Sequence, residues 1–352
     1  MKKNITFLIA LLLSSFFIYA QNIGNFKVKE KEKRQAEQIY NQAVNKITNG
    51  DYYSAMGDLD QALSLNPMFA EAYLQRGKAQ YELHNEYAAL ADISRAIEWN
   101  STFGEAYFCR AFVQFFVDTS QVDISDFDMA IQYGYADAQV YYYRGLLKLI
   151  RNQPEASIAD FTKAIESKPN YAKAYHDRGT AKRMTGDYQG AIYDYRMAIN
   201  YDSNMPSAYD NMGSAKKAIG DFEGAINDFT LAINQDSTFY MAYNNRGGAK
   251  LVLGDLDGAK ADFEKALELH PDYAYAICNM GNVESKMGDY AKAIEDYDKT
   301  ITLKPDHAIA FLNRGLAKEL TGDLRGACED WQMAYDMGIN EAAEYIKECD
   351  QQ

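Results

Sequence analysis

Residues 174–198 read AYHDRGTAKRMTGDYQGAIYDYRMA. Alanines, glycines and aromatic residues recur in this segment at helical spacing, on both sides of the dipeptide Gly186-Asp187. A glycine readily ends a helix because it adopts a left-handed backbone, and an aspartate caps the N-terminus of the helix that follows. The segment therefore predicts two short helices joined by a tight turn.

The same pattern recurs every 34 residues along most of this chain of 352 residues. Division into blocks of 34 from Ala36 gives nine blocks over residues 36–341, each with a small residue at its eighth place. These residues are Ala43, Gly77, Ala111, Gly145, Gly179, Gly213, Gly247, Gly281 and Gly315. A fixed period of this length indicates a repeat array, because one block alone cannot bury its apolar face and must stack on its neighbours.

Other places of the block agree with this register. The fourth place is aromatic or isoleucine, the twenty-fourth is aromatic, leucine or isoleucine, and the twenty-seventh is alanine except at Thr300. The Gly-Asp turn recurs at Gly50, Gly186, Gly220, Gly254, Gly288 and Gly322. Each block is thus predicted to form two helices with one apolar face each.

With these residues in place, the chain resembles the tetratricopeptide repeat family over residues 36–341. The resemblance implies an all-α fold, a right-handed superhelical solenoid of nine helix pairs whose first helices line a concave groove. Residues 342–352 resemble the extra helix that caps such arrays at the C-terminus. We expect no strand in residues 36–341.

The N-terminus is typical of a secretory signal peptide, residues 1–20, with Lys2 and Lys3 before an apolar run that ends at Ala20. The competing interpretation is an uncleaved membrane anchor, but the run is shorter than the about 20 apolar residues that cross a bilayer. No cysteine near Ala20 could accept a lipid. The sequence predicts an exported protein, periplasmic or extracellular in a Gram-negative-type bacterium, without a lipoprotein anchor or stable membrane insertion after cleavage.

The charge of the chain argues against nucleic acid as a partner. It carries 36 lysines and arginines against 50 aspartates and glutamates, for a formal net charge of -14 at pH 7. Such an excess repels phosphates and anionic lipid. Residues 21–35 form a basic lead-in, which we interpret as a solvated charge run.

No group of residues indicates catalysis. The four histidines lie in four different blocks, and neither a metal-ligand spacing nor a glycine-rich phosphate loop occurs. We therefore expect no catalytic residue, metal or cofactor. The predicted function is a non-catalytic scaffold that binds a peptide or protein partner in its groove, within a cell-envelope or secretion assembly. The alternative is an accessory subunit of an envelope enzyme, or a glycan-recognising module.

Two charged columns follow the repeat. The twenty-third place is aspartate in all nine blocks and the seventh place is arginine in six. Repetition at the architectural period indicates a ladder of structural ion pairs rather than a metal or catalytic site. Each pair is expected to be exposed and to contribute only about 0–1 kcal/mol. The aspartates are Asp58, Asp92, Asp126, Asp160, Asp194, Asp228, Asp262, Asp296 and Asp330, and the arginines are Arg76, Arg110, Arg144, Arg178, Arg246 and Arg314.

The family resemblance identifies places two, five, nine and twelve of the first helices as the groove. This face is apolar in blocks two to four and polar in blocks five to seven, which predicts a peptide with one apolar end. An alternative stays open: block three has Asp123 where alanine is usual and lacks the Gly-Asp turn, so it is distorted and buries its rings. The predicted groove residues are Leu74, Tyr81, Phe108, Phe112, Phe115, Tyr142, Leu146, His176, Arg183, Asp210, Lys217 and Asn244.

Two of the four cysteines are candidates for a disulfide bond. Antiparallel packing of the terminal helix on block nine would bring Cys328 and Cys349 together, and export supplies an oxidising setting. Two buried free thiols are the alternative. Cys109 and Cys278 are five blocks apart and should stay unpaired.

Overall fold

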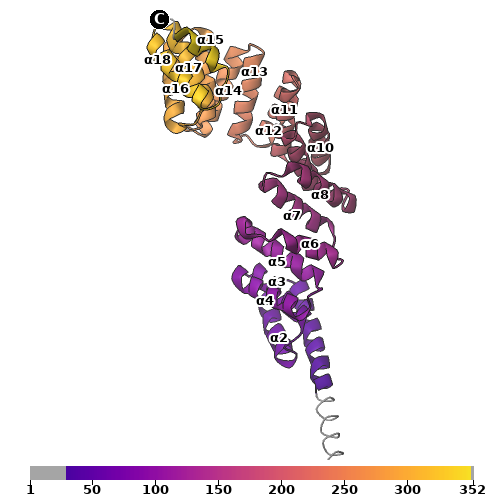
Figure 1. The fold of residues 1–352 in the computed structure, drawn as a ribbon. Coiled ribbons are helices and arrows are strands. Elements are labelled where there is room, and N and C mark those ends of the chain that lie inside the picture. The colour runs from indigo at the N-terminus through magenta and orange to yellow at the C-terminus, as the bar shows by residue number, and fades with distance from the viewer. Residues whose placement is uncertain (1–28, 350–352) are drawn as a thin grey trace, which may run out of the picture. The chain divides into compact units, whose positions relative to one another are not determined.

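The computed structural model describes residues 29–349, and every regular element in that range is a helix (Figure 1). The chain divides into two compact units. The first unit ends at Arg151 and the second begins at Asn152. The expected signal peptide, residues 1–20, and the first part of the basic lead-in lie outside the described residues. Residues 29–35 of the lead-in form the start of the first helix, which runs over residues 29–48.

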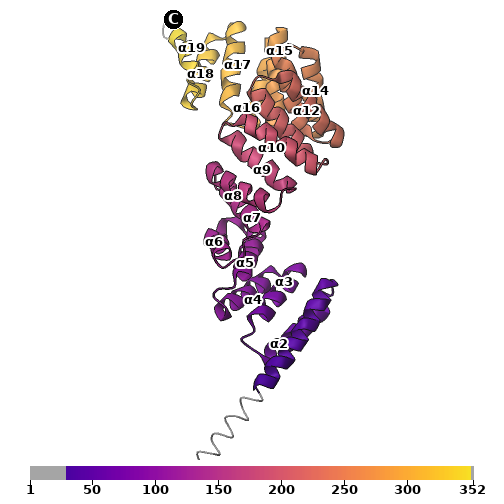
Figure 2. The ribbon, with the colours of Figure 1, turned by 90° about the vertical axis from the view of Figure 1, so that its right-hand side faces the viewer.

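The first unit continues from that helix to α7, and the second unit contains α8 to α19 (Figure 2). In the first unit the elements are α2 (Tyr52–Leu65), α3 (Ala70–Glu82), α4 (Glu86–Trp99), α5 (Gly104–Val117), the 3-10 helix η1 (Thr119–Gln121), α6 (Ile124–Gln132) and α7 (Ala138–Ile150). In the second they are α8 (Pro154–Ser167), α9 (Ala172–Met184), α10 (Tyr188–Tyr201), α11 (Pro206–Ala218), α12 (Phe222–Gln235), α13 (Tyr240–Val252), α14 (Leu256–Leu269), α15 (Ala274–Met287), α16 (Tyr290–Leu303), α17 (Ala308–Leu320), α18 (Leu324–Asp336) and α19 (Ala342–Cys349).

The helices follow the period of the sequence. In the second unit α9, α11, α13, α15 and α17 begin at 34-residue intervals, and each packs on the helix that follows it. The same pairing joins α3 to α4 and α5 to α6 in the first unit. The fold is therefore the expected all-α array of consecutively packed helix pairs, without a strand in residues 29–349.

The Gly-Asp turns have the predicted geometry. Gly186 ends α9 with a φ of 85°, and the side chain of Asp187 accepts a hydrogen bond from the backbone N–H of Gly190 at 2.9 Å. Two turns use other residues at the glycine place, His84 and Asn152, whose φ angles are 60° and 56°. A left-handed backbone costs about 1–2 kcal/mol for a residue with a side chain, so these two turns are strained relative to the others.

Close contact between the two helices of a block explains the small residues at the eighth place. A Cβ added at Gly213 would lie 2.8 Å from Cε1 of Phe229, which is fully buried. At Gly247 the corresponding distance to Cε1 of Phe263 is 2.7 Å. The ring at the twenty-fourth place thus fills the space that a larger side chain at the eighth place would need.

Block three is distorted, as the alternative interpretation of the sequence held. Its second helix, α6, is only nine residues long and follows η1. Asp123 accepts a hydrogen bond from the backbone N–H of Ser125 at 3.0 Å and so fixes the late start of α6. Phe108 packs in the core of the first unit and is only 6% exposed.

The expectation of an exposed aromatic groove is therefore wrong for several residues. Leu74 is completely buried, and Phe108 and Tyr142 are less than a tenth exposed. Tyr81, Phe112, Phe115 and Leu146 are half-buried.

The predicted ion-pair ladder is confirmed. Arg178 donates two hydrogen bonds to the carboxylate of Asp194, at 2.9 and 2.7 Å, and Lys182 lies 2.8 Å from the same carboxylate. Arginine-aspartate pairs of this kind, with two hydrogen bonds each, are Arg76–Asp92, Arg110–Asp126, Arg178–Asp194, Arg246–Asp262 and Arg314–Asp330.

The ladder differs from the expectation in being buried. The Asp194 side chain has no exposed surface, and the Arg178 and Lys182 side chains are 13% and 19% exposed. The weak contribution expected for exposed pairs does not apply to a buried pair, and we expect a larger loss of stability there, because removal of one member leaves charge in a poorly solvated site.

The same arginines also join neighbouring blocks. Arg76 Nη1 lies 2.7 Å from Asp60 of the preceding block, and Arg314 Nη1 lies 2.6 Å from Asp298. The corresponding partner of Arg246 is the hydroxyl of Thr230, at 3.1 Å.

Block eight lacks both cations of the ladder. Met280 stands at the arginine place and Glu284 at the place where five other blocks have a lysine paired with the aspartate. Oδ2 of Asp296 is buried and has no hydrogen-bond partner among the described residues. Burial is the main cause that raises the pKa of Asp296 to about 6; the Lys292 charge opposes this rise and the Glu284 charge adds to it. Glu284 itself is held ionised by Lys260 and Lys292, at 2.9 and 2.6 Å.

We expect Asp296→Asn to raise the free energy of unfolding by about 1–2 kcal/mol at pH 7, after allowance for partial solvation of the carboxylate. Because the folded pKa is raised above 3.8, ionisation of Asp296 destabilises the fold above pH 6. The advantage of the variant should shrink as the pH falls from 7 to 4, which urea unfolding of both proteins at several pH values would measure. An advantage that grows toward acid pH would contradict the assignment.

The C-terminal helix α19 is tied to α18. Cys328 and Cys349 form a disulfide bond with a Cα–Cα distance of 6.0 Å, whereas Cys109 and Cys278 are free. Burial raises the pKa of both free thiols to about 12. Tyr345 of α19 stacks on Trp331 of α18 with ring centroids 5.1 Å apart. The end of the last block is thus covered by a packed and covalently attached helix.

Candidate functional site

The first helices of the blocks lie next to one another in the second unit, from α9 through α11, α13 and α15 to α17. Their sixth places carry asparagine in four consecutive blocks. Each of these asparagines forms a side-chain hydrogen bond with a polar residue of the preceding block. The pairs are Asn211 with His176 (3.1 Å), Asn245 with Asp210 (3.0 Å), Asn279 with Asn244 (2.9 Å) and Asn313 with Asn282 (2.8 Å).

These asparagines, here called the amide column, were not among the predicted site residues. The predicted groove comprises only places two, five, nine and twelve of the first helices. The signal was present, because asparagine occupies place six of blocks six to nine without interruption.

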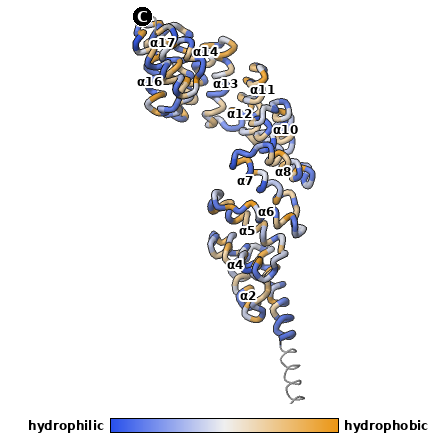
Figure 3. The backbone as a smooth tube through the Cα atoms, in the orientation of Figure 1, coloured by the Kyte–Doolittle hydropathy of each residue, from blue (hydrophilic) through white to orange (hydrophobic). Residues whose placement is uncertain are grey.

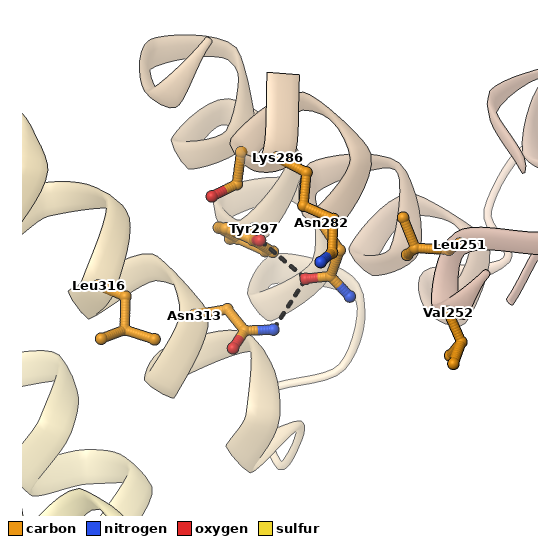
Figure 4. Close-up of a pocket in the computed structure, with 8 residues that line it drawn as sticks. Leu251, Val252, Asn282, Lys286, Tyr297, Asn313 and Leu316 are labelled. Carbon is orange, nitrogen blue, oxygen red and sulfur yellow. Dashed lines mark hydrogen bonds between the residues drawn. The ribbon is translucent and has the colours of Figure 1, made fainter. Parts of the chain in front are cut away.

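A pocket of about 450 Å³ lies over the last three blocks of the second unit (Figure 4). Leu251 and Val252 of α13 lie on one side of it and Leu316 of α17 on the other, with Asn282 and Asn313 between them. Ser285, Lys286 and Tyr297 complete the lining.

Hydrogen bonds fix the orientation of both amides in this pocket. The carbonyl oxygen of Asn282 accepts hydrogen bonds from the Tyr297 hydroxyl and from Asn313 Nδ2, both at 2.8 Å. Tyr297 is only 1% exposed, so its hydroxyl is a rigid donor. The amide nitrogen of Asn282 makes only a long contact of 3.4 Å to Asn279, and the carbonyl of Asn313 accepts no hydrogen bond among the described residues. The two amides therefore offer this pocket one donor and one acceptor at fixed positions.

Farther toward the N-terminus of the second unit, the predicted polar groove residues lie close together. Asp210 is 8% exposed, and its burial raises its pKa although Asn245, Lys217 and Arg183 counteract this. Burial lowers the pKa of Lys217 despite the nearby Asp210 charge. His176 contacts the same amide column through Asn211. Asp210 and Asn244 are thus structural partners of the amide column rather than exposed groups.

The described residues hold no cluster of histidine, cysteine, aspartate or glutamate with the arrangement of a metal site. Polar and apolar stretches alternate along the tube of Figure 3, and among residues 29–349 no helix is both long and apolar enough to span a bilayer.

Comparison with known proteins gives a consistent result. Family models described as tetratricopeptide repeat match residues 142–206, 206–239, 240–273 and 274–307. No curated protein matches the chain.

Among solved structures, MamA is 31% identical, with 47% of this chain and 96% of that chain covered and a TM-score of 0.40. The Pseudomonas aeruginosa protein PilF is 21% identical, with 61% and 96% covered and a TM-score of 0.53. The APC/C hetero-tetramer Cut9-Hcn1 is 14% identical, with 89% and 76% covered and a TM-score of 0.58. The last two show a shared fold alone.

Proposed function

The chain belongs to the tetratricopeptide repeat family, and from this premise we propose that it is a non-catalytic scaffold for a protein partner. The second unit binds an extended segment of that partner along the amide column. The segment crosses the pocket between Asn282 and Asn313. The observation that carries the proposal is the fixed donor and acceptor in this pocket.

A peptide main chain presents one N–H donor and one C=O acceptor per residue, and both must be satisfied when it leaves water. The amide nitrogen of Asn282 uses one N–H in the long contact to Asn279 and can donate the other to a peptide carbonyl, and the carbonyl of Asn313 can accept from a peptide N–H. Because Tyr297 and the neighbouring amides hold these groups in place, little conformational entropy is lost when the peptide binds. The walls formed by Leu251, Val252 and Leu316 would receive an apolar side chain.

We also propose that the protein works outside the cytoplasm, periplasmic or extracellular, as part of an envelope or secretion assembly. Two features support this location. Residues 1–20 have the composition of a secretory signal peptide. The bond between Cys328 and Cys349 is of a kind that persists in oxidising compartments.

The test begins with peptides selected from a random 12-residue displayed library on the chain that starts at residue 21. Binding of each labelled peptide is then measured by fluorescence polarisation to the unchanged chain and to the variant Asn313→Ala/Leu316→Ala. The variant lacks the hydrogen bond from the peptide to the Asn313 carbonyl and the apolar contact with Leu316, each of which contributes about 1 kcal/mol. Their combined loss should weaken peptide binding roughly 30-fold. The circular dichroism spectrum of the variant should not change, because the Tyr297 hydroxyl still donates a hydrogen bond to the carbonyl oxygen of Asn282.

The control is Asn234→Ala, which removes an exposed amide of α12 outside the pocket. This variant should bind the peptides as the unchanged chain does. Selected peptides that bind equally well to all three proteins would show that the pocket is not the binding site.

A further inference from the structure

The first unit contains a pocket of about 370 Å³ with a different chemistry, located where α3, the turn after it and the end of α5 meet. Its lining includes three aromatic rings, Tyr81, Tyr87 and Phe116, and two carboxylates, Glu82 and Glu86. Neither the groove prediction nor the amide column includes Tyr87, Phe116 or the two glutamates.

Two of the three rings, Tyr81 and Phe116, are held in place by a neighbouring ring. Tyr81 and Phe116 each pack edge-on against Phe112, with centroid distances of 5.7 and 5.0 Å. The Phe116 side chain is nevertheless 55% exposed and Tyr87 is 80% exposed. Aromatic faces that remain in contact with water can receive a cation, since the ring quadrupole attracts positive charge.

The two carboxylates carry unbalanced charge. In the ladder Asp92, Asp194 and Asp330 are each matched by an arginine, but neither Glu82 nor Glu86 forms an ion pair within the described part of the chain. Both charges act on the pocket, because they add to the effect of burial in raising the pKa of Tyr81. The described part of the first unit, residues 29–151, carries 12 lysines and arginines against 17 aspartates and glutamates. Its excess of negative charge attracts a cation, and the two carboxylates of the pocket add to this attraction.

A second cavity, also of about 370 Å³, adjoins the first one and shares Tyr81 and Glu82 with it. Its walls are mainly apolar, with Ile47, Phe112 and Val113 among them. Lys78 also lines it, but this lysine is paired with Glu105 and its charge is thereby neutralised.

We propose that the first unit binds a basic peptide, whose lysine or arginine side chain lies among Tyr81, Tyr87 and Phe116 against Glu82 and Glu86. An apolar side chain next to that cation in the peptide occupies the adjoining cavity. Charge complementarity selects this occupant, because a neutral or acidic segment would leave both carboxylates without a partner. The site is independent of the amide column in the second unit.

The probe is a fluorescein-labelled peptide that alternates leucine and arginine, and its neutral counterpart has citrulline in place of each arginine. Fluorescence polarisation with the chain from residue 21 onward should show at least tenfold tighter binding of the arginine peptide. The variant Glu82→Gln/Glu86→Gln should lose most of this difference, and Phe116→Ala should weaken binding of the arginine peptide by about tenfold.

A matched variant, Glu71→Gln/Glu98→Gln, removes the same charge from α3 and α4 outside the two cavities. It should keep the preference for arginine. Equal binding of the two peptides to the unchanged chain, or an equal loss in both double variants, would overturn the site. Sedimentation of the chain alone gives the remaining check. If the unchanged chain forms dimers and the variant Glu82→Gln/Glu86→Gln does not, the pocket binds a second copy of this chain. That result would overturn the proposal of a separate basic peptide. Since these variants do not touch the second unit, they test this site separately from the proposed function.

Discussion

Replacement of Asp194 by asparagine should lower the free energy of unfolding by about 3–5 kcal/mol. The carboxylate of Asp194 has no exposed surface and is contacted by Arg178 and Lys182 at 2.7 and 2.8 Å. An asparagine of the same shape has no charge and presents an N–H₂ group to one of the two cations. Both cations would then be left in a poorly solvated site without a counterion.

The matched control is Asp296→Asn, which makes the same substitution at the same place of block eight. There the arginine and lysine are replaced by Met280 and Glu284, so the change should stabilise the fold instead. Urea unfolding at pH 7, followed by circular dichroism, measures both effects. Since repeat arrays unfold in parts, hydrogen exchange at α9 and α10 should locate the loss in Asp194→Asn. Changes of the same sign in the two variants would contradict the ladder as the source of the difference.

Removal of the disulfide bond should have the second largest effect. The variant Cys328→Ser/Cys349→Ser opens a loop with a sequence separation of 21, which on the chain-entropy model costs about 3 kcal/mol. The loss should appear first as faster hydrogen exchange in α19, which otherwise is held by the bond and by the stacking of Tyr345 on Trp331.

Thermal unfolding with and without reductant measures this effect. Reductant should destabilise the unchanged chain to the level of the double variant and should leave the double variant unaffected. A control, Cys109→Ser, changes a free thiol of the first unit and should retain the response to reductant. If the unchanged chain and the double variant unfold at the same temperature under oxidising conditions, the bond does not stabilise the fold.

Most of the fold could be predicted from the sequence because its determinants are local and repeated. The 34-residue period predicts where the helices begin, and the Gly-Asp dipeptide predicts the turns. The small residue at place eight indicates close packing of the two helices, which the structure shows as contact with the ring at place twenty-four. The distortion of block three could be predicted from Asp123 at an alanine place and from the missing Gly-Asp turn, but the late start of α6 and the capping role of Asp123 appear only in the structure.

The candidate site could be predicted less well, because the sequence does not fix how far each first helix is rotated. Place five was assigned to the open groove, but its side chains lie between neighbouring first helices and are largely buried. The buried residues at place five include Leu74, Phe108, Tyr142, Asp210 and Asn244. The residues that line the two pockets include Asn313 at place six and Phe116 at place thirteen, each one residue after a predicted groove place. A one-residue shift is 100° on a helix, which periodicity alone does not resolve.

The arginines that reach into the preceding block give the array an uneven mechanical strength. Arg76 forms ion pairs with both Asp60 and Asp92, and Arg314 forms ion pairs with both Asp298 and Asp330. Met212 stands at the arginine place of block six, and within residues 29–349 neither an ion pair nor an arginine hydrogen bond crosses the joint before that block. The joint between α10 and α11 therefore depends on the apolar packing of Tyr195 against Met212 and on neutral hydrogen bonds such as that between Asn211 and His176. High salt, which screens ion pairs, should weaken this joint less than the joints that the arginines hold.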